Sequence, residues 1–317
     1  MAGRIKIAFS VLICLGFGGI DASAQTEREK SKNNIIISYP DLVKRLTNLK
    51  SLAILPEEGE GSAMWASYDR RSQVDNHTGK FIDWAANDDG LTPQYISLEE
   101  ENMVLAEMEG PGAIVRVWSA SPGRGNIKIY VDGNETPVID MPFRDFFDIS
   151  SVPAFNYPEL VYETAARGFN NYVPISYQHS CKVVAEPEWG QYYQFNYISF
   201  PEGTELGKFE PIPAPEEAAA LAEVNSFFKD KMGELPYMVT HLEEQKLEGE
   251  ILAGDSKTLK IKGQKAIYAF KAKVKIENMD REAEALRKLV LDIRWDDEEA
   301  PSVWSPLGDF FWDSSWL

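Results

Sequence analysis

IKIYVDGNETPVIDMPFRDFF, residues 127–147, decides the fold, because it returns near the end of the chain as LDIRWDDEEAPSVWSPLGDFF, residues 291–311. The two stretches align without a gap, and both close on Asp-Phe-Phe. The identical positions are Ile129, Asp132, Glu135, Pro137, Pro142, Asp145, Phe146 and Phe147, which match Ile293, Asp296, Glu299, Pro301, Pro306, Asp309, Phe310 and Phe311. Solenoid units repeat at about 20–50 residues, so a repeat at this longer period predicts two copies of one domain.

The repeated stretch is typical of a β-hairpin, since Asp132-Gly133 separates two apolar runs and Asp-Gly is a strong signal for a tight turn. Between Gly59 and Glu210 further short runs rich in Val, Ile, Tyr and Trp alternate with turn residues. The expected strands are Met103–Glu109, Ala113–Ser119, Asn126–Val131, Thr136–Met141, Asn171–Ile175, Cys181–Ala185 and Tyr192–Ser199. No helix follows the strands regularly, so we predict an all-β fold with antiparallel sandwiches of the jelly-roll type.

Composition along the chain predicts five segments and a double jelly roll whose second copy is incomplete. They are a signal peptide (1–24), an N-terminal segment with a short helix (25–58), a first jelly-roll domain (59–210), a linker helix (211–235) and a partial second jelly-roll domain (236–317). Helical spacing appears within Tyr39–Leu55, Glu216–Met232 and Asp280–Lys288, and Ala266–Ile276 is an expected strand. The first copy continues through several strand-like runs after Asp-Phe-Phe, whereas Trp312–Leu317 alone follow the second.

The first residues have the pattern of a secretory signal peptide. Arg4 and Lys6 precede the apolar run Ile7–Ile20, and Ala22-Ser23-Ala24 provides small residues for cleavage. The run is shorter than the stretch of about 20 apolar residues that a membrane-spanning helix needs. We therefore expect a secreted or periplasmic protein, cleaved near Ala24, with no membrane segment.

The net charge of −18 argues against two classes of partner. An acidic surface repels nucleic-acid phosphates and anionic lipids, so we expect neither nucleic acid nor a membrane as a partner. It is compatible with neutral substrates such as sugars, although acidity also serves solubility.

Thiol and metal chemistry are not expected. Cleavage would leave Cys181 as the single thiol, which excludes an internal disulfide and favours a buried, inert side chain over a nucleophile. His179 is two residues away, but alternate strand positions do not make a catalytic pair. The His residues are scattered, and Asn87–Gly90 lacks the spacing of a calcium loop, so a plain turn is favoured there. We predict no metal and no cofactor.

The segment Met64–Trp84, MWASYDRRSQVDNHTGKFIDW, concentrates aromatic and polar residues. Sugar pockets combine aromatic faces with charged groups that bind hydroxyls. The equally plausible interpretation is a structured loop whose aromatics close one end of the sandwich and whose ions pair with one another. The substrate-binding candidates are Trp65, Asp69, Arg70 and Asp83.

Two other patterns contain carboxylates that could take part in catalysis. Glu107 and Glu109 lie two apart on an expected strand and so face the same side, as a glycosidase carboxylate pair could. Acidic residues on a solvated strand face are common, and that interpretation is favoured. The repeated Asp-Phe-Phe is expected to be structural, with the aromatic pair in the core and the acid capping a turn.

Several segments in the same order resemble glycoside hydrolase family 172, also catalogued as domain-of-unknown-function family 2961. They are Trp65–Arg70, Glu109–Trp118, Tyr130–Phe147, Trp295-Asp296 and Pro306–Phe311. The resemblance covers about Ser62 to Phe311. It implies a double jelly roll, homo-oligomers built on trimers, and retaining hydrolysis of fructofuranosides or D-arabinofuranosides by two Glu residues.

The chain departs from that family at its end, where Trp312–Leu317 replace a long tail. The resemblance places the two catalytic Glu in that tail, so no position here receives them. The expectation is a secreted furanoside-acting glycoside hydrolase homologue that is inactive as this chain. The alternative is a non-catalytic carbohydrate-binding or structural assembly protein, because jelly rolls serve both roles.

Overall fold

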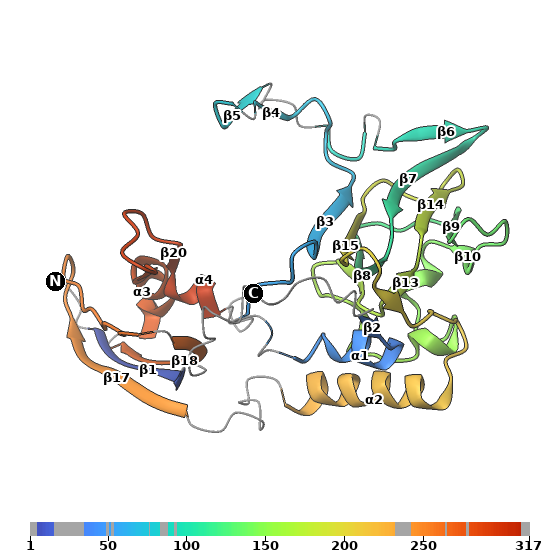
Figure 1. Cartoon of the computed structure of the whole chain (residues 1–317). Helices are drawn as coiled ribbons and strands as arrows, with labels where there is room; N and C mark the ends of the chain where they lie inside the picture. The colour runs from blue at the N-terminus through green and yellow to red at the C-terminus, as the bar shows by residue number, and fades with distance from the viewer. Residues whose placement is uncertain are drawn as a thin grey trace. The chain divides into compact units, whose positions relative to one another are not determined.

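The computed structural model describes residues 5–15, 35–48, 51, 54–75, 77–82, 88–91, 94–231, 242–263, 265–276 and 279–311. The chain forms two compact units, one of Thr26–Glu234 and one that joins Met1–Gln25 to Leu235–Leu317 (Figure 1). Strands in several antiparallel sheets predominate over a few helices, which confirms the all-β prediction.

The first unit is built from two antiparallel sheets. One has the strand order β10 (Ile139–Pro142), β9 (Asn126–Val131), β14 (Ser180–Ala185), β7 (Asn102–Glu109) and β6 (Ser97–Glu99). The other has the order β11 (Val161–Glu163), β12 (Phe169–Asn171), β8 (Gly112–Ser119), β15 (Gln194–Ser199) and β3 (Gly61–Ala66), and β13 (Ile175–Tyr177) also pairs with β8. Leu105, Ile129 and Val183 of the first sheet and Val117 and Phe195 of the second are buried in one core cluster. The two-residue period of these strands therefore buries one face of each sheet.

Several predicted strands begin or end differently in the structure, and two of the differences have a clear local cause. The expected strand Asn171–Ile175 is wrong as a single element, because β12 ends at Asn171 and β13 begins at Ile175. The Asn171 side chain accepts a hydrogen bond from the Val173 N–H (2.9 Å), and Pro174 has no N–H to donate to a ladder. β10 likewise begins at Ile139 rather than Thr136, two residues after Pro137.

The predicted helices form, and the two in the first unit pack on each other. α1 (Tyr39–Lys44) is shorter than expected and is capped by Ser38, whose side chain accepts from the Asp41 N–H (3.2 Å). α2 (Pro215–Asp230) begins with Pro at its first position, and the Glu217 carboxylate accepts from the Ala214 N–H (2.8 Å). Its residues Ala220, Leu221 and Val224 join the core of the first unit.

Smaller elements complete the first unit. β2 (Ile36–Ile37) pairs in parallel with β16 (Glu205–Leu206), and β4 (Gln73–Asp75) pairs with β5 (Lys80–Ile82). The 3-10 helices η2 (Asp145–Phe147) and η3 (Pro153–Phe155) follow β10.

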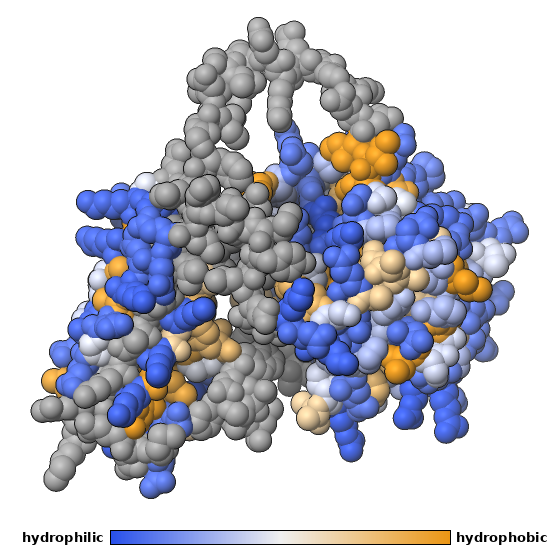
Figure 2. All heavy atoms as spheres, turned by 90° about the horizontal axis from the view of Figure 1, so that it is seen from below, coloured by the Kyte–Doolittle hydropathy of each residue, from blue (hydrophilic) through white to orange (hydrophobic). Residues whose placement is uncertain are grey.

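No helix in the described part of the chain is long and apolar enough to cross a membrane. On the face shown in Figure 2, hydrophilic residues predominate and apolar residues form separate patches.

The second unit contains a sheet with the order β17 (Leu242–Ile251), β1 (Ile5–Leu15) and β18 (Lys265–Ile276). β1 is central and antiparallel to both neighbours, with Ile5 opposite Ile251 on one side and opposite Ile276 on the other. The unit also contains η4 (Met279–Arg281), α3 (Glu282–Lys288), α4 (Leu307–Phe311) and a hairpin of β19 (Val290–Ile293) with β20 (Val303–Pro306). The part of the expected signal-peptide run that the structure describes, residues 7–15, thus lies in a central strand, and cleavage of the run stays a prediction.

The repeated hairpin has the same register in both units. Ile139 of β10 pairs with Ile129 of β9, and the corresponding Val303 of β20 pairs with Ile293 of β19. The turns correspond as well, with φ values of 57° and 69° at Asp132-Gly133 and 45° and 63° at Asp296-Asp297. Positive φ at two successive residues is typical of the centre of a type I′ turn, which here begins the longer loop that joins the two strands. The internal repeat is therefore structural as well as sequential.

The Asp-Phe-Phe ends of the two hairpins also correspond. The two Phe rings are 5.5 Å apart at 77° in the first copy and 5.1 Å apart at 79° in the second. Phe146 and Phe147 are buried, as expected. The predicted capping role of the acid is wrong for η2, which has no side-chain cap hydrogen bond. In the second copy Asp309 instead accepts two hydrogen bonds of 2.7 Å from Arg287.

Candidate functional site at the end of strand β3

The end of β3 and the residues after it bring most of the predicted sugar-binding side chains together. We call this group the β3-end cluster. Its members are Trp65, Tyr68, Asp69, Arg70, Arg71, Asp88 and Tyr193. Backbone hydrogen bonds hold its ends, since the Ser67 N–H donates to the Tyr193 carbonyl (3.1 Å) and the Gly90 N–H to the Ser67 carbonyl (2.9 Å).

Trp65 lies on the inner side of β3. Its neighbour across the ladder is Phe195, which is fully buried, and its indole N–H donates to the Glu107 carbonyl of β7 (2.9 Å). The indole therefore links the two sheets and packs against the core. This placement suits the closing of one end of the sandwich, and the sugar-binding role of Trp65 stays a prediction.

Asp69 is buried, with 1% of its surface exposed, and each of its carboxylate oxygens is engaged. Arg71 donates to it from Nε (3.0 and 3.2 Å) and from a terminal nitrogen (2.5 Å), and the Asp88 N–H adds a bond of 3.1 Å. The Arg71 side chain is the main cause that holds the pKa of Asp69 far below its usual range. Asp69 thus anchors the turn as a permanent anion.

Arg70 and Tyr68 extend the cluster toward solvent. The Arg70 guanidinium donates to the Ala66 carbonyl (3.3 Å) and to the Tyr193 hydroxyl (3.4 Å). It also lies 5.0 Å from the centre of the Tyr68 ring, a cation–π distance. Tyr68 is 50% exposed, so its ring can stack on a ligand while it contacts the Arg70 guanidinium.

Asp83 lies outside the described residues, so its role stays a prediction. The residue pattern did not indicate Asp88, whose carboxylate pairs with Arg71, or Tyr193, which directly precedes β15 and accepts a hydrogen bond from Arg70. The spacing of Asp69 and Asp88 carries no periodic signal that could have paired them. The accessible groups of the cluster are the Tyr68 ring, the Arg71 guanidinium and the Asp88 carboxylate.

The Asp69 anion makes a testable contribution to acid stability. Its folded pKa is below the unfolded value of about 3.9, so it stabilises the fold above that pH and the stabilisation is lost as the pH falls through the folded pKa. We expect Asp69→Asn to lower the melting temperature clearly at pH 7, and by a smaller but still measurable amount at pH 3, where the unfolded carboxyl is largely protonated and the folded one is still ionised. Thermal unfolding at both pH values measures this.

The matched control is Glu135→Gln, which removes the same charge from an exposed turn. It should leave the melting temperature unchanged at both pH values. An equal loss from Asp69→Asn at pH 3 and pH 7 would show that packing, not the ionised carboxylate, stabilises the turn.

The other sequence candidates do not form a site. Glu107 and Glu109 do share the exposed face of β7, as predicted, and they lie opposite Lys182 and Ser180. Lys182 pairs with Glu99 at 2.9 Å. Cys181 is buried, as expected, and burial raises the pKa of its thiol well above the ordinary value, so the thiol stays protonated.

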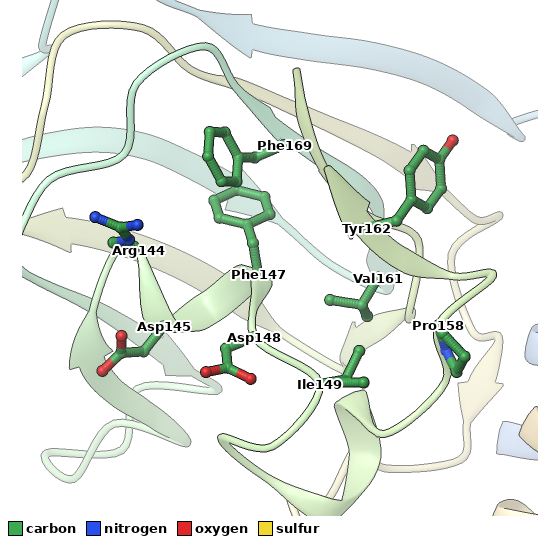
Figure 3. Close-up of a pocket in the computed structure, with 9 residues that line it drawn as sticks. All are labelled: Arg144, Asp145, Phe147, Asp148, Ile149, Pro158, Val161, Tyr162 and Phe169. Carbon is green, nitrogen blue, oxygen red and sulfur yellow. The ribbon is translucent and has the colours of Figure 1, made fainter. Parts of the chain in front are cut away.

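A hollow of about 380 Å³ lies beside the first Asp-Phe-Phe (Figure 3). Phe147 and Phe169 lie next to each other at its edge, with 5.8 Å between ring centres, and both pack on the core. The Asp148 carboxylate there accepts from the Ser150 N–H (2.8 Å) and hydroxyl (2.7 Å), bonds that lower its pKa. The hollow is thus bordered by core aromatics and by an acid that is already bonded.

Comparison with known families decides the relationship. Residues 58–217 match the GH172 first beta-sandwich domain, which is more than half of the 317 residues. The chain belongs to glycoside hydrolase family 172. Residues 241–314 match a GH172 domain-like region, so both units carry family 172 sequence. No curated protein matches the chain.

The family match agrees with the resemblance carried by Trp65–Arg70 and by the two hairpins. The β3-end cluster lies inside the first matched region, as do both sheets of the first unit. Membership of a glycoside hydrolase family points to a carbohydrate as the ligand of such a cluster.

Proposed function

We propose that this family 172 protein acts on furanosides of the fructofuranoside or D-arabinofuranoside type and holds the sugar at the β3-end cluster. The observation that carries the proposal is the exposed Tyr68 ring, which contacts Arg70 and lies three residues before Arg71, the partner of Asp88. An aromatic face packs on sugar C–H groups, and the charged pair binds hydroxyls. We further propose that the protein is exported and assembles as a trimer-based homo-oligomer.

The cluster is suited to binding rather than to acid catalysis. Retaining hydrolysis needs a carboxylic acid with a raised pKa and a second carboxylate as the nucleophile. The pKa of Asp69 is instead lowered, and Asp88 is paired with Arg71. We propose that the catalytic carboxylates are not those of this cluster, and that this chain binds its sugar without turnover.

Turnover and binding are tested separately. This chain, and a version extended at its C-terminus with the corresponding sequence of a family 172 relative, are incubated with aryl furanosides and with fructan and arabinan oligosaccharides. We expect hydrolysis by the extended version alone. Absence of turnover by the extended version would remove the enzymatic proposal, and turnover by the unextended chain would show that its own residues contain the catalytic pair.

Tyr68→Ala should weaken furanoside binding by about tenfold, the effect of losing roughly 1.4 kcal/mol of ring contact. Isothermal titration calorimetry measures the change. Tyr130→Ala, on the other sheet, is the matched control and should bind as the unchanged protein does. Equal affinity in both variants would place the sugar elsewhere.

A non-catalytic carbohydrate-binding or assembly protein is the second candidate. It is favoured by the fact that Asp69 and Asp88 are both committed to Arg71. It predicts binding without turnover even in the extended version, and light scattering would reveal the assembly.

A further inference from the structure

The sheet that contains β3 has a polar outer face that the β3-end cluster does not use. Residues directly opposite one another on antiparallel strands share a face. Asn170 of β12 is opposite Trp118 of β8, and Trp118 is opposite Gln194 of β15. In the next row Arg116 of β8 is opposite Asn196 of β15. We call these five side chains the outer-face group.

The opposite face of the same strands packs on the core, so the outer-face group lies on the side away from the core. Val117 lies between Arg116 and Trp118, and Phe195 lies between Gln194 and Asn196, and both are buried in the core. Arg116, Trp118, Gln194 and Asn196 are half-buried instead, as expected for side chains on the outer side.

Arg116 organises the amides around it. Its guanidinium donates to the side-chain oxygens of Gln194 (2.8 Å), Asn196 (3.2 Å) and Asn170 (3.3 Å). Because each amide turns its oxygen toward Arg116, its NH₂ group is directed away from the cation. The Asn170 NH₂ donates to the Gly168 carbonyl (3.1 Å). In the described part of the chain, the NH₂ groups of Gln194 and Asn196 have no protein acceptor.

The positive charge of Arg116 is also uncompensated. No carboxylate of the described residues lies within ion-pair distance of it, although the whole chain carries a net charge of −18. The face therefore offers N–H donors and one cation. A ligand that completes these bonds must be rich in oxygen acceptors.

Aromatic rings border the donors. Arg116 lies 5.8 Å from the centre of the Tyr172 ring, and Tyr172 stacks on Tyr162 with 6.2 Å between ring centres and 16° between planes. Trp118 sits in the middle of the row, between Asn170 and Gln194. From Tyr162 on β11 to Gln194 on β15 the row crosses four strands, a length of roughly 14 Å.

We propose that the outer-face group is a second saccharide-binding surface, separate from the β3-end cluster, which holds a chain of sugar units across the strands. The NH₂ groups of Gln194 and Asn196 donate to sugar oxygens, and the Trp118 ring contacts the sugar's apolar face. Arg116 positions the amides and provides the charge that favours an oxygen-rich ligand. Such a surface would hold a polymer on the protein independently of any turnover.

The test measures binding of a neutral fructofuranose oligosaccharide and of a galacturonic acid oligosaccharide by calorimetry. The double variant Gln194→Ala/Asn196→Ala should weaken binding of the better ligand at least about tenfold. Gln194→Glu keeps the side-chain size and supplies Arg116 with a carboxylate, so it should weaken binding as well. Thermal unfolding of each variant establishes that it is folded.

Two controls separate this surface from the proposed function. Asn126→Ala removes an amide from β9 on the other sheet and should leave affinity unchanged. Tyr68→Ala should weaken binding at the β3-end cluster alone, so the affinity that remains in this variant is that of the outer face. If the neutral oligosaccharide binds more tightly, the surface recognises hydroxyl groups. If the uronate binds more tightly, Arg116 recognises its carboxylates. No binding of either saccharide, or unchanged affinity in both outer-face variants, overturns the proposal.

Discussion

Removal of residues 1–24 is expected to make the second unit sensitive to protease while the first unit stays resistant. β1 provides the hydrogen-bonding partner for both β17 and β18, with pairs that run from Ile5–Ile251 to Cys14–Leu242 on the β17 side. Without β1, β17 and β18 each lose the backbone hydrogen bonds that they make with it. Unpaired edges and isolated strand pairs are marginally stable in water.

The resistant fragment should end after α2, between residues 231 and 242. Three side chains of α2 belong to the core of the first unit, and the Asn225 side chain accepts from the Glu159 N–H (2.9 Å). Limited proteolysis with mass spectrometry, applied to the chain with and without residues 1–24, measures both boundaries. Equal protection of β17 and β18 in the two forms would show that β1 does not stabilise this sheet.

The sequence predicted the elements whose signals are local. Asp132-Gly133 predicted a turn between two paired strands, and the turn forms with positive φ at both residues, within a loop that runs from Val131 to Ile139. α2 is recognisable from Pro215 at its start and from the spacing of its apolar residues. The repeat predicted a second hairpin, and its register agrees pair for pair with the first. Each of these signals lies within one element or within one aligned copy.

Contacts between distant segments could not be predicted in the same way. The residue pattern placed Asp69 among sugar-binding candidates, yet Arg71 and Asp88 occupy its oxygens. The Trp65 indole meets a backbone carbonyl of the other sheet, which no side-chain pattern reveals. A single sequence shows which residues are polar or aromatic, whereas the packing of the two sheets decides which of them remain accessible.

Apolar patterning was likewise insufficient to assign the run Ile7–Ile20. An apolar stretch of this length suits a signal peptide and a buried strand equally well. The structure places its first part in β1, between two strands from the far end of the chain. Strand partners so distant in sequence cannot be inferred from the run itself, so its export role and its pairing must be tested together.

Phe146→Ala is expected to destabilise the first unit by about 3–5 kcal/mol, the cost of removing a fully buried Phe. Only 1% of the Phe146 surface is exposed. Its ring centre lies 4.9 Å from that of Phe155 and 6.4 Å from that of Phe143, so the cavity would open within a group of aromatic rings that cannot collapse freely. Native-state hydrogen exchange of the β8 and β15 amides measures the loss.

The repeat supplies the matched control, because Phe310 occupies the corresponding position of the second hairpin. Phe310 is half-buried, and its ring centre lies 5.7 Å from that of Phe270 and 5.1 Å from that of Phe311. We expect Phe310→Ala to cost well under half as much, since less apolar surface leaves water there. It should also leave exchange of the β8 and β15 amides unchanged. If both variants destabilise their units equally, Phe310 is as well buried as Phe146. The aromatic pair then belongs to the core in both units.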